Sequence, residues 1–223
     1  MAPAPDHSPR TPAGPRVPGV LRPVGDAEPP AHDLVLEDAE VAWTGGDRVD
    51  ARGVALSGCR MANVDLTGAR LPGLDLTDVV VAGGSLANAD LRGATWRRVE
   101  IRGARLTGLR LTDARLDEVV LRDCRVDLAA LGGSRLRRVV LVDCRMTGCD
   151  LQDLAGEDLL LEGCDLQDAD LTGARFTRTE LRGCPLEGAR GLERLRGVGM
   201  RWEDVLASAG AFAGHLGVRL VDG

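Results

Sequence analysis

Residues 89–108 read ADLRGATWRRVEIRGARLTG and contain four consecutive five-residue units of one kind. Each unit begins with a small or branched apolar residue, at Ala89, Ala94, Val99 and Ala104, and has a larger apolar residue two positions later. The other three positions hold polar residues or glycine. Neither the 3.6-residue period of a helix nor the two-residue period of a strand fits this pattern. The five-residue repeat therefore decides the fold.

The larger apolar residue of each unit recurs at every fifth position from Leu56 to Leu186, with Gly156 as the one exception. We expect these centre positions to point inward, since the charged residues fall elsewhere in each unit. The exception is interpreted as local repacking, with the bulky Leu154 filling the gap. The principal predicted core centres are Leu56, Met61, Leu66, Leu71, Leu76, Trp96, Ile101, Leu121, Leu141, Leu161 and Phe176.

A second period of twenty residues lies on top of the first. The segments TDVVVAGG at 77–84, RRVEIRGA at 97–104, DEVVLRDC at 117–124 and RRVVLVDC at 137–144 recur at this spacing. Gly or Asp commonly follows each centre by two positions, and these residues tolerate tight turns. The pattern predicts a squared coil of four five-residue walls, with coils stacked about 4.8 Å apart.

The units ADLRG at 89–93, ARLTG at 104–108, CDLQD at 164–168 and ADLTG at 169–173 resemble the pentapeptide-repeat family, whose unit is A(D/N)LXX. The resemblance covers residues 54–190 in one register. It implies an all-β solenoid, a right-handed quadrilateral parallel β-helix. Some members of the family, the quinolone-resistance type, are dimeric acidic rods that look like duplex DNA and bind DNA gyrase.

Three regions are expected along the chain. The first is a disordered tail at residues 1–32, which are rich in Pro and contain no signal peptide or membrane span. The second is the β-helix at residues 33–196. The third is a helical cap and tail at residues 197–223. Apolar residues in the last region recur at helical spacing. This helix either only caps the rod or also pairs two rods, and its predicted apolar face consists of Trp202, Val205, Leu206, Ala209, Phe212 and Leu216.

Composition argues against several functions. The net charge of −6 gives no basic face for direct nucleic-acid binding, and without a targeting segment we expect a cytoplasmic protein with reduced cysteines. The only histidines, His7, His32 and His215, lie outside the array, so no Ser/His or Cys/His pair forms inside it. We therefore expect no enzyme, metal or cofactor. Four cysteines twenty residues apart are interpreted as core packing: Cys124, Cys144, Cys164 and Cys184.

One wall carries apolar residues at outward positions. They directly precede the centres of that wall and form a stripe of Val80, Val120, Val140 and Leu160, with Val142 beside them. An exposed apolar patch favours a partner or self-association surface. The alternative is that β-branched residues simply favour strands.

Charge is banded along the rod. Residues 92–138 hold twelve Arg against six acids, whereas residues 143–170 hold nine acids against Arg145 alone. The acidic band, a candidate DNA mimic, includes Asp150, Asp153, Asp165, Asp168 and Asp170. Residues 34–196 nevertheless carry a net charge of only −4, where a duplex of about 32 Å carries roughly 19 negative charges. The sequence thus favours a non-catalytic platform for protein binding, with a gyrase or topoisomerase binder as the alternative.

Overall fold

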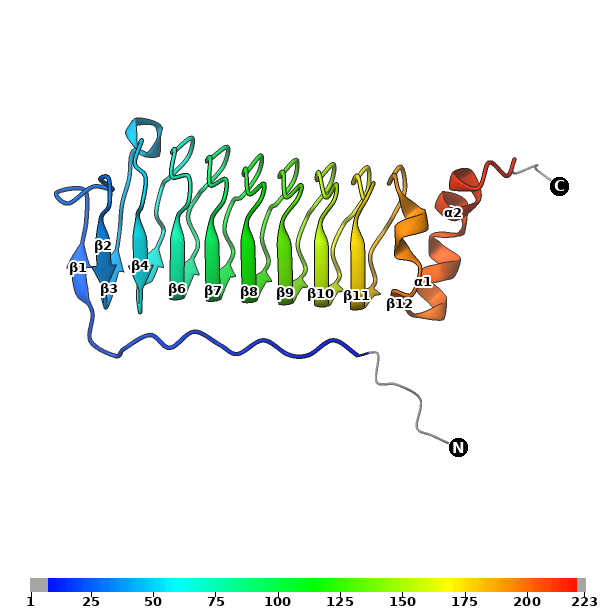
Figure 1. Ribbon diagram of the computed structural model, residues 1–223, viewed down its shortest axis with the longest axis horizontal. Helices are drawn as coiled ribbons and strands as arrows, with labels where there is room; N and C mark the ends of the chain where they lie inside the picture. The colour runs from blue at the N-terminus through cyan, green and yellow to red at the C-terminus, as the bar shows by residue number, and fades with distance from the viewer. Residues whose placement is uncertain (1–7, 220–223) are drawn as a thin grey trace.

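The computed structural model describes residues 8–219, which form a parallel β-solenoid of about nine turns followed by two short helices (Figure 1). All strand pairs are parallel and belong to one twelve-stranded sheet. The strands are β1 (Arg22–Val24), β2 (Val35–Glu37), β3 (Ala39–Val41), β4 (Ala55–Ser57), β5 (Arg60–Ala62), β6 (Asp75–Ala82), β7 (Thr95–Arg102), β8 (Arg115–Arg122), β9 (Arg135–Val142), β10 (Ala155–Glu162), β11 (Arg175–Arg182) and β12 (Gly199–Met200). The helices are α1 (Trp202–Ala207) and α2 (Ala209–His215), and 3-10 turns lie at Gly46–Arg48 and Leu192–Leu195.

The register of the long strands follows the twenty-residue period. Leu76 of β6 lies beside Trp96 of β7, which lies beside Leu116 of β8, so equivalent residues stack in columns along the rod. The remaining walls are joined by isolated bridges at the same spacing, such as Arg70 with Asp90. The predicted β-helix is therefore confirmed, and residues twenty positions apart lie in the same column of the rod.

The corners of the coil explain the choice of residues between walls. Every fifth residue from Gly53 to Gly188 has a positive φ, a region that only Gly, Asn and Asp enter readily. Five residues of other types occupy corners: Arg98, Glu118, Leu128, Arg138 and Arg178. Four of these five fall twenty or forty residues apart and hence on the same corner column, which also holds Asp78 and Asp158.

The core is a continuous column of apolar side chains inside the coil. The predicted centres are buried, except that Phe176 is only partly buried. At Gly156 the nearest atoms to the site of a missing Cβ belong to Leu159 and Phe176, at 2.4 and 3.0 Å. Leu159 and Phe176 therefore lie nearest to the gap left in the centre column, and Leu154, the residue expected there, is buried in the same coil.

The rod begins earlier than expected from the Pro-rich composition. Strand β1 pairs with β3 in parallel, Val24 is buried, and the indole Nε1 of Trp43 donates a hydrogen bond to the carbonyl oxygen of Glu28. Pro23 is tolerated because β1 is an edge strand. The expected disordered tail up to residue 32 is corrected accordingly.

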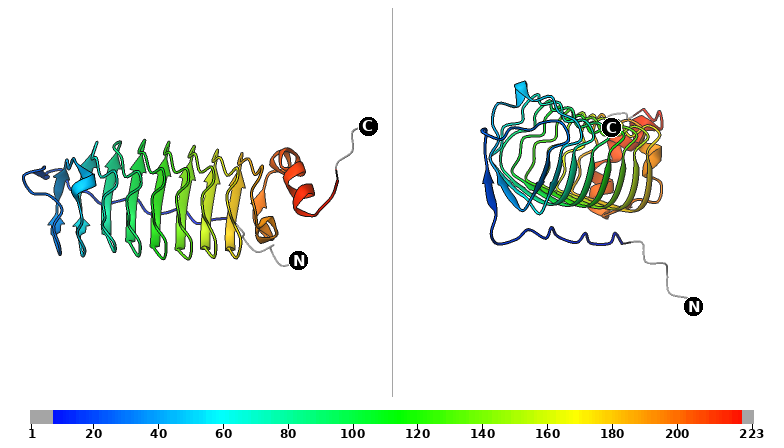
Figure 2. Two further views of the ribbon diagram at one scale, coloured as in Figure 1. Left: turned by 90° about the horizontal axis from the view of Figure 1, so that it is seen from above. Right: turned by 60° about the vertical axis from the view of Figure 1, so that its left-hand side comes forward.

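Residues 8–21, the strap, leave β1 and run back along the outside of the rod toward β10 (Figures 1 and 2). The strap makes no β-ladder, and its prolines recur at every third residue: Pro9, Pro12, Pro15 and Pro18. All four are partly buried, while Arg10, Thr11, Ala13, Gly14 and Arg16 between them are exposed. The proline side of the strap thus faces the rod. Residues 1–7 of the predicted tail lie outside the described residues.

The C-terminal end closes with two helices instead of the single helix expected over 202–216. Strand β12 first extends the sheet by pairing with β11, which moves the end of the rod from residue 196 to residue 200. The two helices meet at Ser208, which is buried, and Ala211 and Phe212 of α2 pack against the core. Within residues 8–219, no helix is long and apolar enough to cross a membrane.

Candidate interaction surfaces

The apolar stripe lies where the sequence predicts it, on the outward side of the strands' second halves. Val80, Val120, Val140 and Leu160 fall in one column of the sheet, with Glu100 between the first two. All are half-buried, as is Val142. On the adjoining wall, by contrast, the equivalent residues Arg105, Arg125 and Arg145 are exposed. The stripe is therefore more covered than this adjoining wall.

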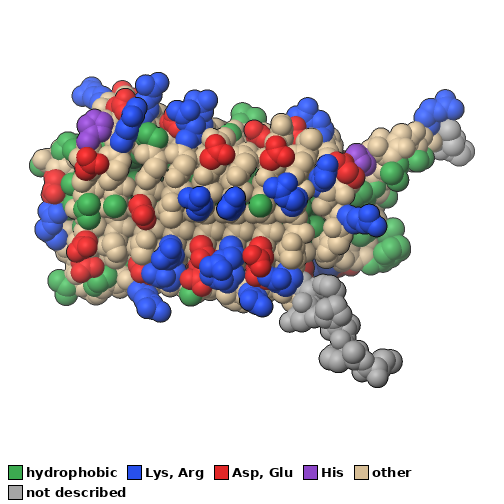
Figure 3. All heavy atoms as spheres, viewed as in Figure 1, with side chains coloured by type: hydrophobic (Ala, Val, Ile, Leu, Met, Phe, Trp, Pro, Cys, Tyr) green, Lys and Arg blue, Asp and Glu red, His purple; other side chains and the backbone are tan. Residues whose placement is uncertain are grey.

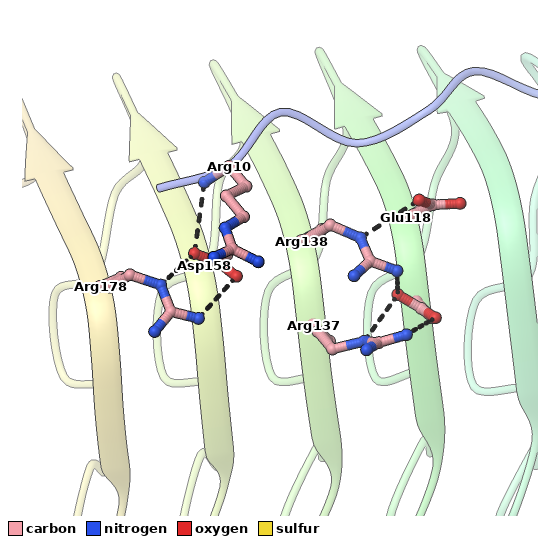
Figure 4. A network of polar contacts seen from close by, with 7 residues as sticks. Arg10, Glu118, Arg137, Arg138, Asp158 and Arg178 are labelled. Atoms are coloured by element: carbon pink, nitrogen blue, oxygen red, sulfur yellow. Dashed lines mark hydrogen bonds and ion pairs between the residues drawn. The ribbon is translucent and has the colours of Figure 1, made fainter. Parts of the chain in front are cut away.

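A ladder of ion pairs runs along the corner beside this stripe, and Figure 4 shows its second and third pairs. Arg98 Nη2 lies 2.6 Å from Asp78 Oδ2, and Arg138 Nε lies 3.2 Å from Glu118 Oε1. The third pair, Arg178 Nε and Asp158 Oδ1, is 2.6 Å apart. Acid and Arg thus alternate from coil to coil, with an acid at every second coil.

Two of these Arg side chains stabilise the ionised form of the preceding carboxylate. The hydrogen bond from Arg98 lowers the pKa of Asp78, and the one from Arg178 lowers the pKa of Asp158. The Asp158 side chain is only 2% exposed, so its charge depends on these partners. Both carboxylates are consequently hydrogen-bond acceptors at neutral pH.

The strap uses two of these carboxylates. The backbone N–H of Arg16 donates to Asp78 Oδ1 at 3.0 Å. The backbone N–H of Arg10 donates to Asp158 Oδ1 at 3.3 Å (Figure 4). Pro18 Cδ lies 3.3 Å from the position that a Cβ on Gly58 would take, on the same corner column. Sequence reasoning missed this contact, although the three-residue proline spacing could have indicated an extended ligand-like segment.

The C-terminal helices leave most of their apolar residues uncovered. Trp202, Leu206 and Leu216 are 71%, 57% and 76% exposed, and Ala209 is also exposed. Val205 and Phe212 are half-buried. Hydrophobic side chains gather at this end of the rod in the space-filling view (Figure 3). The helices therefore cover the end of the core and present an apolar surface to solvent.

The acids of the predicted DNA-mimic band lie on two adjoining walls and their corners. Asp150 and Asp170 face each other across a bridge, while Asp153 and Asp168 are corner residues. Asp170 is buried and lies 2.9 Å from Arg190 Nη2, and hydrogen bonds from Thr172 lower its pKa. Asp165 accepts a hydrogen bond from Thr147 and Asp150 accepts one from the Gln152 N–H. Internal partners thus take up much of the band's hydrogen-bonding capacity.

A shallow hollow of about 760 Å³ lies on the wall formed by the strands' first halves. Five Arg and two acids line it: Arg97, Arg115, Arg135, Arg137, Arg175, Asp117 and Glu157. Arg137 and Arg138 both pair with Asp117, so part of this positive charge is neutralised within the wall. The hollow contains no cysteine, serine or histidine that could act as a nucleophile or base.

The six cysteines are all buried and unpaired with one another by disulfides. Burial raises the pKa of the Cys149 thiol to about 12 and also raises that of Cys59, which disfavours the reactive thiolate. Within residues 8–219, no three side chains of the metal-binding types His, Cys, Asp and Glu come together. In the column of Cys124, Cys144, Cys164 and Cys184, every residue is at most 3% exposed and every thiol donates a hydrogen bond to a backbone carbonyl oxygen, which is the environment of core packing.

A parallel solenoid with a left-handed corner at every fifth residue defines the class of five-residue-repeat β-helices. The model of the family described as pentapeptide repeats matches eight copies over residues 47–80, 85–123, 114–153 and 159–190, more than half of the chain. The chain therefore belongs to the pentapeptide-repeat family. No curated protein matches it.

The chain is also similar to several solved structures, all with low TM-scores. HetL, a pentapeptide-repeat protein involved in regulating heterocyst differentiation in the cyanobacterium Nostoc sp. strain PCC 7120, is 21% identical over 74% of this chain and 84% of its own, with a TM-score of 0.32. A trypsin-treated form of QnrB1, a plasmid-mediated fluoroquinolone resistance protein, is 16% identical over 90% of this chain and 98% of its own, with a TM-score of 0.30. Rfr23 from the cyanobacterium Cyanothece 51142 is 20% identical over 62% of this chain and 88% of its own, with a TM-score of 0.25.

Proposed function

We propose that this protein is a non-catalytic interaction protein, a rigid rod that presents its surfaces to protein partners and pairs with a second copy through its C-terminal helices. The observation that carries the proposal is the concentration of uncovered apolar side chains at one end. Four of the seven large hydrophobic residues that are exposed within residues 8–219 lie between 202 and 218.

Self-pairing follows from the position of these residues. They lie on α1 or directly after α2, beyond the last strand, where a second copy can approach without meeting the walls of the rod. A two-fold arrangement uses the same patch on both copies, so one exposed surface supplies both halves of the interface. An exposed Trp is the kind of residue that dominates such contacts once it is buried.

Mass measurement tests this proposal. Light scattering on the purified chain is expected to give twice the monomer mass, and Trp202→Glu with Leu206→Glu is expected to give a folded monomer. A matched control is Leu128→Asp, because Leu128 is 67% exposed in the middle of the rod and has a corner backbone that accepts Asp. A monomeric wild-type chain, or a dimer that persists in the Trp202 and Leu206 variant, contradicts pairing through these helices.

A further inference from the structure

We propose that the wall carrying the apolar stripe is a binding surface for polyproline-II segments, and that the strap is its built-in ligand. The surface consists of the stripe and the adjoining corner column that holds Asp78 and Asp158. The segment that this surface binds has a proline at every third residue, and the residue after each proline has a free backbone N–H. The strap has this chemistry in the repeated triplets PRT, PAG and PRV at residues 9–17.

The periods of the two structures match. A polyproline-II helix advances about 3.1 Å per residue, so one three-residue turn covers roughly 9.3 Å. Two coils of the rod cover roughly 9.6 Å, since neighbouring strands lie about 4.8 Å apart. Each strap triplet therefore spans two coils, which is also the spacing of the acids along the corner column.

The two observed contacts fit this register. Arg16 and Arg10 are two triplets apart and bond to Asp78 and Asp158, which are four coils apart in β6 and β10. Six polyproline-II residues extend about 18.6 Å and four coils about 19.2 Å, a mismatch of well under one residue. In the same register, Ala13 falls opposite Glu118, the acid between the two.

Backbone strain is concentrated on the same column. Arg98, Glu118, Arg138 and Arg178 hold the left-handed conformation, which costs about 1–2 kcal/mol for a residue other than glycine. Their side chains build the alternating ladder that fixes the acceptor carboxylates. Strain of this kind commonly marks functional positions, and here it lies on the corner column that accepts both hydrogen bonds from the strap.

The charge of the strap adds to the fit. Arg10 and Arg16 are its only charged residues, and each directly follows a proline, so that the guanidinium lies next to the donating N–H. Extended proline-rich segments lose little conformational entropy on binding, which is why apolar grooves recognise them elsewhere. The surface thus selects a proline-rich, basic segment over an acidic or a helical one.

A peptide-binding experiment on the full chain tests the proposal. The released variant carries Pro9→Gly, Pro12→Gly and Pro15→Gly, which remove the polyproline-II preference of the strap and leave the rod unchanged. The probe is a fluorescent peptide with the sequence of residues 8–19, titrated by anisotropy. We expect the released variant to bind at least tenfold more tightly than the wild-type chain, because an attached strap competes at a millimolar effective concentration.

Two further arms test the register. Adding Asp78→Gly and Asp158→Gly to the released variant is expected to weaken peptide binding at least tenfold. The backbone accepts these substitutions because Gly58, on the same column, already has a positive φ. The matched control is Asp113→Gly with Asp153→Gly on another corner, which is expected to change nothing. A peptide with one Gly inserted between Ala13 and Gly14 is expected to lose at least tenfold in affinity. Equal binding by both chains, no binding by either, or equal binding of the inserted peptide overturns the proposal.

Discussion

At the scale of single residues, most corner positions hold Gly, Asn or Asp, and a few hold residues for which the left-handed conformation costs free energy. Leu128 is the exception that no ion pair explains: its φ is 57° and its side chain is 67% exposed. The same column holds Asn88, Gly108 and Gly148, residues for which this conformation is easy. Leu128 therefore holds a conformation that its neighbours on this column adopt at lower cost.

Replacing Leu128 is expected to stabilise the protein. Leu128→Asn should raise the free energy of unfolding by about 1 kcal/mol, since Asn enters the left-handed region at lower cost. Urea unfolding followed by circular dichroism measures the change. The reverse substitution on the same column, Asn88→Leu, should lower stability by a similar amount. A loss of stability in Leu128→Asn would show that the exposed leucine contributes packing that outweighs its strain.

Sequence alone predicted the residue pattern well, because every coil repeats the same local rule. Inward centres and Gly or Asp corners follow from spacing without knowledge of the neighbours. Gly156 shows the limit of that reasoning: the side chains nearest its gap, Leu159 and Phe176, come from the following wall and the next coil. A one-dimensional pattern does not say which of several nearby side chains turns into a vacant site.

At the scale of elements, the strap is the part that sequence reasoning missed. Its two hydrogen bonds join residues 62 and 148 positions apart, so no local period connects them. Pro-rich composition predicts an unfolded tail because such segments form no core of their own. The strap is ordered by a surface that exists only after the rod has folded. The helix break at Ser208 was missed for a similar reason, since it depends on how α2 packs against the rod end.

Proteolysis provides a direct test of the strap as an element. Trypsin should cut the native chain after Arg10 and Arg16 more slowly than it cuts Asp78→Gly with Asp158→Gly, because the variant loses both acceptors. Mass spectrometry of timed samples measures the two rates. The pair Asp113→Gly with Asp153→Gly should behave as the wild type does. Equal rates in all three proteins would mean that these hydrogen bonds do not hold the strap.

At the scale of the whole molecule, charge distinguishes this rod from a duplex mimic. Residues 34–196 carry a net charge of −4, and Arg alternates with acids on the outer positions. Roughly 19 negative charges would be needed over about 32 Å to match duplex DNA. The acids of the band at 143–170 are also partly engaged with Arg190, Thr147 and Gln152.

We therefore expect no inhibition of DNA gyrase. A supercoiling assay with micromolar protein should proceed at the uninhibited rate, with a small-molecule gyrase inhibitor as the positive control. Inhibition that disappears when Asp150, Asp153, Asp165 and Asp168 are changed to Asn would contradict this prediction. It would establish the acidic band as a partial mimic in spite of its low net charge.

The strap also has a consequence for the order of events on the ribosome. Arg10 is synthesised 148 residues before Asp158, which at 5–20 residues per second is a delay of roughly 7–30 s. Coils stack on one another as they emerge, yet the far end of the strap has no place to bind until β10 has formed. Binding of this end of the strap therefore requires that the rod has been synthesised and folded as far as β10. A chain whose synthesis stops earlier keeps this end free and open to proteases.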